Sequence, residues 1–177
     1  AGAYWKYFAG PSGAPAGWAA KNHDDASWPG GPAELGYGDE PPDEATIIPY
    51  GGNAASKWIA TYFRHAFLLN DPAAATNLIL QLKRDDGAVV YLNGREVLRD
   101  EMPATAITPQ TLASRGALDD GQDFHAFYLD PAPLRIGTNV LAVEIHQSAP
   151  NSSDISFDAA LEVWMASNRP PGLWLTA

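Results

Sequence analysis

Two stretches of the chain show a clear alternation of apolar and other residues. Residues 78–83 carry leucine at every second position, and residues 155–164 place Ile, Phe, Ala, Leu and Val in the same way. Successive side chains of a β-strand point to opposite faces, so each stretch predicts a strand with one buried face. Between them, Asn93-Gly94 is the signal for a two-residue hairpin turn in which both residues have positive φ. The sequence therefore predicts an antiparallel hairpin in the middle of the chain.

Runs of β-forming residues bounded by turn residues predict six further strands. They are residues 4–8, 61–69, 88–92, 95–99, 124–129 and 139–147. No stretch shows a convincing amphipathic helix period. About eight strands without such a helix predict an all-β fold, a two-sheet antiparallel β-sandwich of the jelly-roll type.

Two long segments lack any period. Residues 10–57 are dominated by Gly, Pro, Ala, Asn and Asp, with Trp18, Trp28, Tyr37 and Tyr50 spaced among them. Regularly placed aromatic residues indicate that this segment is an ordered wrap pinned to the body of the domain. The second polar segment, residues 100–121, predicts a loop.

The length of 177 residues fits one domain with a sizeable core. We expect the sandwich to occupy residues 1–167. Residues 168–177 begin with Asn168-Arg169-Pro170-Pro171 and are interpreted as a linker-like tail towards a following domain. The chain has neither an initiator Met nor a signal-peptide pattern, which we interpret as a processed protein or a piece of a multidomain protein.

Charge and cysteine content exclude several classes of function. The net charge of −10 arises from 21 acidic and 11 basic residues, without a basic stripe that would attract a phosphate backbone, so no nucleic-acid partner is expected. No apolar run approaches the ~20 residues of a membrane span. The absence of cysteine excludes disulfides, thiolate metal sites and a Cys nucleophile, but it leaves the compartment open.

Several motifs together resemble a known family. In chain order they are Trp5-Lys6-Tyr7, Asp24-Asp25-Ala26-Ser27-Trp28, Leu35-Gly36-Tyr37-Gly38-Asp39, Thr61-Tyr62-Phe63-Arg64, Arg84-Asp85-Asp86-Gly87, Tyr91-Leu92-Asn93-Gly94, Gly137-Thr138-Asn139-Val140-Leu141 and Ser152-Ser153-Asp154. The set resembles the galactose-binding-like jelly-roll modules of secreted bacterial hydrolases, calcineurin-like phosphoesterases and cell-surface proteins. It is also similar to the sugar-binding domain of bacterial β-galactosidases. The resemblance implies this jelly-roll fold, export from a bacterial cell, and neighbouring domains in the same polypeptide.

Paired aspartates are the candidate metal ligands. Asp85 and Asp86 precede Gly87, and Asp24 and Asp25 precede Ser27-Trp28. Carboxylate oxygens at a turn suit Ca²⁺, which would here stiffen the fold. The alternative, which we favour, is that these residues cap turns through their own backbone. The pair Asp119-Asp120 lies in the unpatterned segment and is expected to be solvated charge.

The candidate saccharide-binding residues combine wrap aromatics with the polar loop that follows residue 146. Sugars stack on exposed aromatic rings, and His, amide and carboxylate groups bind their hydroxyls. The predicted contacts are Trp18, Tyr37, Trp58, Arg64, His146, Gln147, Ser153 and Asp154. A structural role for His146, and burial of any one of the aromatics, are the alternatives.

A catalytic role has little support in the sequence. A nucleophile elbow, a phosphate loop and a zinc-protease motif are all missing. Asp154 and Asp158, on one strand, would lie about 13 Å apart, too far for the ~5.5 Å or ~6.5–9.5 Å carboxyl pairs of glycosidases. We therefore predict a non-catalytic carbohydrate-binding accessory module that binds a poly- or oligosaccharide. The alternatives are a structural domain that positions a catalytic neighbour, and a small hydrolase.

Overall fold

The computed structural model describes residues 2–38 and 44–166. The predicted tail at residues 168–177 lies outside this part of the chain. The described residues form eleven strands and one 3₁₀ helix, η1 (Pro72–Ala74). The strands are β1 (Tyr4–Ala9), β2 (Gly30–Pro32), β3 (Leu35–Tyr37), β4 (Thr46–Ile47), β5 (Ala60–Leu69), β6 (Ala75–Arg84), β7 (Gly87–Leu92), β8 (Arg95–Asp100), β9 (His125–Leu129), β10 (Gly137–His146) and β11 (Ile155–Met165).

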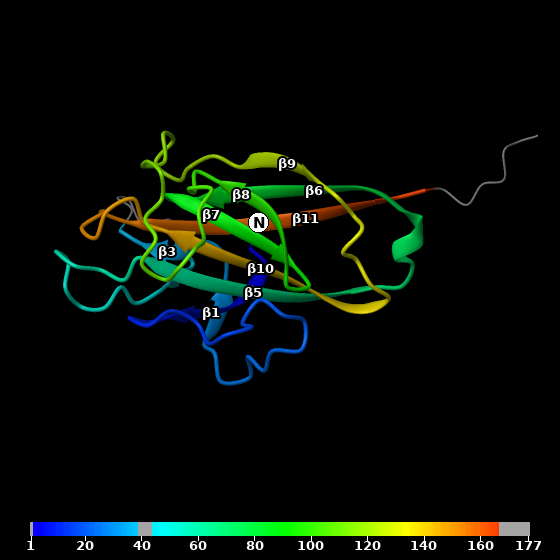
Figure 1. Cartoon of the computed structure of the whole chain (residues 1–177), viewed down its shortest axis with the longest axis horizontal. Coiled ribbons are helices and arrows are strands. Elements are labelled where there is room, and N and C mark those ends of the chain that lie inside the picture. The colour runs from blue at the N-terminus through cyan, green and yellow to red at the C-terminus, as the bar shows by residue number, and fades with distance from the viewer. Residues whose placement is uncertain (1, 39–43, 167–177) are drawn as a thin grey trace, which may run out of the picture.

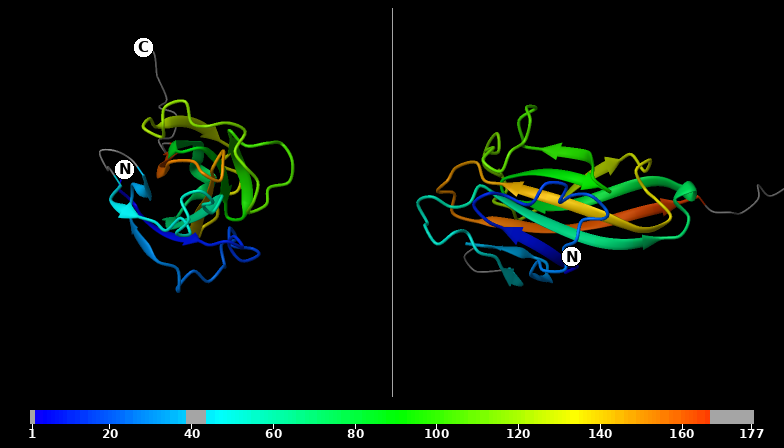
Figure 2. Two further views of the ribbon diagram at one scale, coloured as in Figure 1. Left: turned by 90° about the vertical axis from the view of Figure 1, so that its left-hand side faces the viewer. Right: turned by 60° about the horizontal axis from the view of Figure 1, so that its bottom comes forward.

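The strands form two sheets that pack face to face (Figures 1 and 2). The first sheet has the order β2-β1-β5-β10-β7-β8, and the second has the order β4-β3-β11-β6-β9. All paired strands are antiparallel except β3 and β4. The predicted all-β sandwich is therefore confirmed, with one short parallel pair as the difference.

The core lies where the alternating apolar residues of the two sheets meet. Leu78, Leu80 and Leu82 of β6 are fully buried there, as the alternation predicts. Phe63 of β5 stacks on Phe157 of β11 with a distance of 4.1 Å between ring centroids, which joins the sheets through the centre of the sandwich. Burial of these side chains is the main stabilising contribution to the fold.

The predicted hairpin joins β7 and β8. Asn93 and Gly94 have φ values of 54° and 85°, so the turn has the conformation that this residue pair favours. Asn93 also accepts a hydrogen bond at Oδ1 from the Val140 amide of β10 (2.9 Å). The turn is thereby fastened to the neighbouring strand.

Residues 10–29, which we call the N-terminal loop, cover the outer face of the first sheet. Trp18 contacts the rings of Tyr62 and Tyr91, and Trp28 packs on Phe8. The expectation of an ordered wrap is confirmed here. The sequence did not reveal β2, β3 and β4, because strands of two or three residues are too short for an alternation to be visible.

Three connections gather at one end of the sandwich, at the left in Figure 1. They are residues 48–59, residues 101–124, which we call the cleft loop, and residues 147–154. Asp85 and Asp86 lie at the same end, where the chain crosses from β6 of one sheet to β7 of the other. No helix in the described ranges is long and apolar enough to cross a membrane.

Candidate functional site

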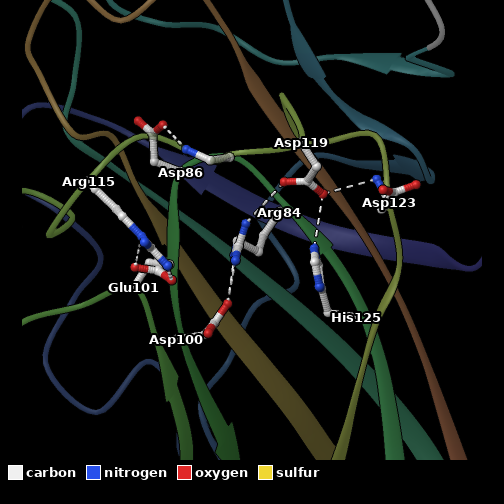
Figure 3. A network of polar contacts seen from close by, with 9 residues as sticks. Arg84, Asp86, Asp100, Glu101, Arg115, Asp119, Asp123 and His125 are labelled. Carbon is white, nitrogen blue, oxygen red and sulfur yellow. Dashed lines mark hydrogen bonds and ion pairs between the residues drawn. The ribbon is translucent and has the colours of Figure 1, made fainter.

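A polar cleft of about 440 Å³ opens between the cleft loop and the strand ends beside it. Its walls come from β6, β8, β9 and the cleft loop. The residues that carry its chemistry are Arg84, Asp100, Glu101, Arg115, Asp119 and His125 (Figure 3). Phe127 and Leu118 add apolar surface to the wall. The volume falls in the range of small-molecule sites.

Arg84 is the buried cation of the cleft. It ends β6 and is only 6% exposed. Its Nε donates to Asp100 Oδ2 (2.8 Å), and Nη2 lies 2.7 Å from the same oxygen. Its Nη1 is buried and has no hydrogen-bond partner, although Asp119 Oδ1 lies 3.6 Å away. The nearby Asp119 carboxylate offsets the charge of this buried N–H group, although it is too distant for a hydrogen bond.

Asp119 connects the cleft loop to β9. Its Oδ2 accepts hydrogen bonds from His125 Nε2 (3.0 Å) and from the Asp123 amide (3.2 Å). Burial is the largest influence and opposes ionisation, but the hydrogen bonds from His125 and from the backbone amides of Asp119 and Asp123 together outweigh it, and the pKa of Asp119 is lowered. The expectation that Asp119 is solvated charge was therefore wrong. Its carboxylate is held between a histidine and an arginine.

The rim of the cleft is a second arginine–carboxylate pair. Arg115 Nε donates to Glu101 Oε2 (2.6 Å), and Arg115 Nη2 donates to Glu101 Oε1. This two-point hydrogen bond lowers the pKa of Glu101. The Arg115 side chain is more than half exposed, so its remaining N–H groups can reach a ligand at the mouth of the cleft.

Asp86 holds the loops in place behind the cleft. Its Oδ1 accepts from the Ala117 amide of the cleft loop (3.0 Å), and its Oδ2 accepts from the Ser148 amide (2.6 Å). The adjacent Asp85 is equally buried, and its pKa is raised to about 9 by desolvation and by the hydrogen bond and charge of Asp86. At neutral pH Asp85 is thus protonated and can donate a hydrogen bond to Asp86. The Asp86 side chain thus binds two distant loops, which differs from the predicted capping of its own turn.

Five of the eight predicted saccharide contacts lie together near the same end of the sandwich. They are Tyr37, Trp58, Gln147, Ser153 and Asp154. Gln147 Nε2 donates to the Tyr37 hydroxyl and to the Trp58 carbonyl, both at 2.8 Å. The backbone carbonyl of Ser153 accepts a hydrogen bond from Lys57 Nζ (2.6 Å).

Burial limits what this group offers to a ligand. The expectation that Tyr37 is exposed was wrong, since it is only 6% exposed and packs against Tyr50. Burial, together with the charge of Asp154, raises the pKa of Tyr37. Trp58 is half-buried and lines an open apolar hollow with Tyr50. Stacking of a sugar on Trp58 stays a prediction.

The other three predicted contacts lie towards the outer face of the first sheet. Arg64 is buried under the N-terminal loop, where it binds Asp25 (2.7 Å) and the carbonyls of Trp18 and Ala20. The prediction that Arg64 contacts a saccharide was therefore wrong, because its buried guanidinium binds the N-terminal loop. Trp18 is half-buried under the same loop.

His146 is fully buried between the outer face and the cleft loop. Its Nδ1 donates to the Thr111 carbonyl (2.7 Å), and its Nε2 lies 3.1 Å from Glu144 Oε2. Glu144 in turn accepts a hydrogen bond from the Tyr91 hydroxyl (2.6 Å). The fully buried His146 presents no surface to a saccharide, which supports its structural alternative.

The four aspartates do not form a ready metal centre. Asp24 Oδ1 caps a turn by accepting from the Ala26 amide (3.0 Å), and Asp25 pairs with Arg64. Within residues 2–38 and 44–166, no group of three or more His, Cys, Asp or Glu side chains is placed to hold a metal ion. Binding of Ca²⁺ therefore stays a prediction without a preformed site.

The sequence reasoning missed the residues of the polar cleft. Arg84 was visible only as the residue before Asp85-Asp86, and Arg115 and Asp119 lie in a segment without period. His125 lies in the strand predicted at residues 124–129 but has no metal-ligand spacing to other histidines. The one sequence signal for the polar cleft is the charged residue Arg84 at the end of a largely apolar strand.

Comparison with known proteins gives similar structures only. No protein-family model matches the sequence, and no curated protein matches it. A glycosyl hydrolase family 2 member from Bacteroides cellulosilyticus is similar over 90% of this chain and 20% of its own, with a TM-score of 0.55 and 16% identity.

Two β-glucuronidases are also similar in structure. The enzyme from Bifidobacterium dentium, solved with coumarin-3-O-glucuronide, is covered over 19% of its length by 82% of this chain (TM-score 0.50, 19% identity). The Lactobacillus rhamnosus β-glucuronidase is covered over 20% of its length by 82% of this chain (TM-score 0.51, 15% identity). The chain thus spans about a fifth of these glycosidases and has the fold of one β-sandwich domain within them.

Proposed function

We propose that the chain is a non-catalytic module of a larger carbohydrate-active protein and binds a saccharide in the polar cleft. The observation that carries the proposal is the polar cleft itself, whose wall combines Arg84 and Arg115 with the carboxylates of Asp100, Glu101 and Asp119. A sugar hydroxyl can accept from the exposed Arg115 guanidinium while it donates to a carboxylate of the wall, so one sugar can engage both kinds of group. The similarity to single domains of glycosidases supports the same class of protein.

The composition of the cleft favours a neutral sugar over a free anion. Two arginines face three carboxylates there, namely Asp100, Glu101 and Asp119. A neutral polyol adds no charge to such a site, whereas an additional carboxylate is repelled by those already present. Phe127 and Leu118 provide apolar surface for the C–H face of the ring.

The same residues support a role without catalysis. A general acid at neutral pH requires a raised carboxyl pKa together with access to substrate. Asp119 and Glu101 in the cleft have lowered pKa values. Asp85 has a raised pKa but is buried behind the loops. Binding without turnover is therefore the function that these carboxylates support.

The proposal extends to the partners and the location of the protein. We infer that the other domains of the same polypeptide carry the chemistry and that this module holds the polysaccharide near them. Export from a bacterial cell stays a prediction that rests on the family resemblance. Neither the role of the neighbouring domains nor the export depends on the geometry of the cleft.

Isothermal titration and affinity electrophoresis against a panel of polysaccharides test the binding. The panel includes uronic-acid polymers, because two of the similar structures are β-glucuronidases. We expect the full chain to bind at least one neutral glycan and His125→Ala to weaken that binding at least roughly tenfold. Tyr128→Ala is the control, because this exposed ring lies on the same strand but on the opposite face.

Two results would contradict the proposal. One is a folded chain that binds no glycan, and the other is a glycan whose affinity is unchanged in His125→Ala. The first result would favour a structural domain that positions a catalytic neighbour. The observation that supports this second candidate is that the chain spans about a fifth of larger glycosidases.

A further inference from the structure

A second cavity lies between the two sheets and is separate from the polar cleft. It has a volume of about 170 Å³ and shares no lining residue with the cleft. We call it the inter-sheet cavity, because its wall comes from β1, β5 and β10 of one sheet and β11 of the other. The side chains that matter in this wall are Trp5, His65, Phe67, Leu141, Leu161 and Val163. Its size suits a ligand of one ring, since an apolar cavity of about 150 Å³ binds benzene.

Most of the wall is apolar and incompletely covered. Phe67, Leu161 and Val163 pack against the core but are only half-buried. An apolar ring that enters the cavity removes part of this surface from water, which is favourable in free energy. The hydrophobic effect therefore supplies the affinity for such a ring, and the polar groups of the wall decide which ring is preferred.

Trp5 provides the hydrogen-bond donor of the cavity. It lies in β1, is only 1% exposed, and packs against Phe157 with 4.9 Å between the ring centroids. Its indole Nε1 is buried and has no hydrogen-bond partner within residues 2–38 and 44–166. Buried polar groups of proteins are almost always paired, so a ligand that brings an acceptor would satisfy this N–H group.

His65 provides an acceptor beside this donor. Its ring centroid lies 5.2 Å from that of Trp5, and it has the same parity on β5 as the buried Phe63, which places it on the inner face. Its Nδ1 lies 2.8 Å from the Tyr4 carbonyl oxygen, and a carbonyl only accepts, so Nδ1 carries the proton. In the neutral imidazole Nε2 is then unprotonated and accepts a hydrogen bond.

We propose that the inter-sheet cavity binds a small phenol, with its ring among the apolar side chains and its hydroxyl between Trp5 and His65. A hydroxyl group is both donor and acceptor, so it accepts from Trp5 Nε1 and donates to His65 Nε2. An ether or a ketone offers only the acceptor and leaves His65 without a donor. An aromatic ring is favoured because Trp5, His65 and Phe67 line the cavity, and paired aromatic rings attract one another beyond the area that they bury.

Two compounds of similar shape test the proposal in the full chain. p-Cresol and toluene differ only in the hydroxyl, and titration calorimetry measures the affinity of each. We expect Trp5→Phe and His65→Phe, which keep a ring at each position, to weaken p-cresol binding at least about tenfold and to change toluene binding less than about twofold. Trp164→Phe is the matched control, because this exposed indole lies on the outer face of β11.

The indole proton of Trp5 gives a second readout that depends on no change to the cavity. Its NMR resonance is identified among the six tryptophans as the one that is missing in Trp5→Phe. In the wild-type chain p-cresol should shift this resonance downfield, the direction in which a hydrogen bond moves it, and toluene should not. If Trp5→Phe loses toluene binding as well, this resonance alone decides the question.

The remaining outcomes also decide the question. If neither compound binds to the folded chain, the cavity is not a ligand site. If toluene binds as tightly as p-cresol and neither variant changes this, the cavity accepts any apolar ring and the assignment to a phenol is overturned. If Trp164→Phe weakens p-cresol binding as much as Trp5→Phe does, the phenol binds elsewhere. The proposal does not depend on saccharide binding, because no measurement involves a glycan.

Discussion

The N-terminal loop and the cleft loop are both long, polar and without period, yet they are fastened to the sandwich in different ways. The N-terminal loop is held by Trp18 and Trp28, whose rings pack on the first sheet, and by the guanidinium of Arg64 beneath them. The cleft loop is held by charged and polar groups, chiefly Asp86 and His146. Aromatic packing seals a surface, whereas directional hydrogen bonds leave open volume between them.

This difference has a functional meaning. Under the N-terminal loop, Arg64 donates hydrogen bonds to carbonyls of the loop and to Asp25. Beside the cleft loop, Arg84 binds Asp100 but keeps Nη1 without a hydrogen-bond partner. The two buried arginines therefore have different surroundings: Arg64 is enclosed by a loop, and Arg84 lies in the wall of an open cleft.

The largest effect is expected when the structural arginine is removed. Arg64→Met leaves the Asp25 carboxylate and several loop carbonyls without their donor. We expect the free energy of unfolding to fall by about 2–3 kcal/mol, below the usual cost of breaking a fully buried ion pair from one side, because Asp25 is partly exposed. Urea unfolding followed by far-UV circular dichroism measures it. A loss below about 1 kcal/mol would mean that the N-terminal loop is held by its aromatics alone.

The charge-based fastening of the cleft loop should respond to pH. Asp85 has a pKa of about 9 in the folded state, against 3.8 as a free side chain, so the folded state binds the proton more tightly. Its stabilising contribution is complete below pH 3.8 and is lost as the pH rises through 9. Desolvation is the main cause, and the charges of Asp86, Asp154 and Asp120 strengthen the effect.

Asp85→Asn isolates this contribution. The amide still donates a hydrogen bond to Asp86 but cannot ionise, so we expect the variant to be more stable than the wild type at pH 9, by on the order of 2 kcal/mol. Melting temperatures from pH 5 to pH 10 measure the difference. Asp24→Asn, at an exposed turn, serves as the control. Identical pH profiles for wild type and Asp85→Asn would show that the buried pair does not titrate in this range.

The smallest effect on stability is expected at the rim of the cleft. Arg115 is exposed, and exposed ion pairs contribute little, so Arg115→Gln should leave the melting temperature unchanged. Affinity for the bound glycan should fall by roughly 2- to 10-fold, because a charged donor at the mouth is replaced by a neutral one. Titration calorimetry measures the affinity. Unchanged affinity would confine binding to the inner part of the cleft.

The strands were predictable because their signals are local. Alternation over ten residues marks β11, and the pair Asn93-Gly94 specifies its own turn. These features depend on neighbours in sequence and need no knowledge of the fold. The same holds for the aromatic spacing that indicated an ordered wrap in the N-terminal loop.

The cleft was not predictable because its contacts are distant in sequence. Arg84, Asp100 and Asp119 come from β6, β8 and the cleft loop. The residues adjacent to each of them in sequence do not indicate which side chain it contacts. Burial of Tyr37 and His146 likewise follows from the way loops fold over the end of the sandwich. A residue type gives the chemistry of a site, but the path of the loops decides whether that chemistry faces solvent.

The two-residue crossing at Asp85-Asp86 has a mechanical consequence. It ties β6 of one sheet to β7 of the other at a single corner, and the loops that Asp86 binds lie around that corner. The sheets are joined at the opposite end as well, where residues 70–74 connect β5 to β6 and residues 130–136 connect β9 to β10. Neither end of the sandwich is therefore free to open, and the polar cleft lies beside one of these fixed corners.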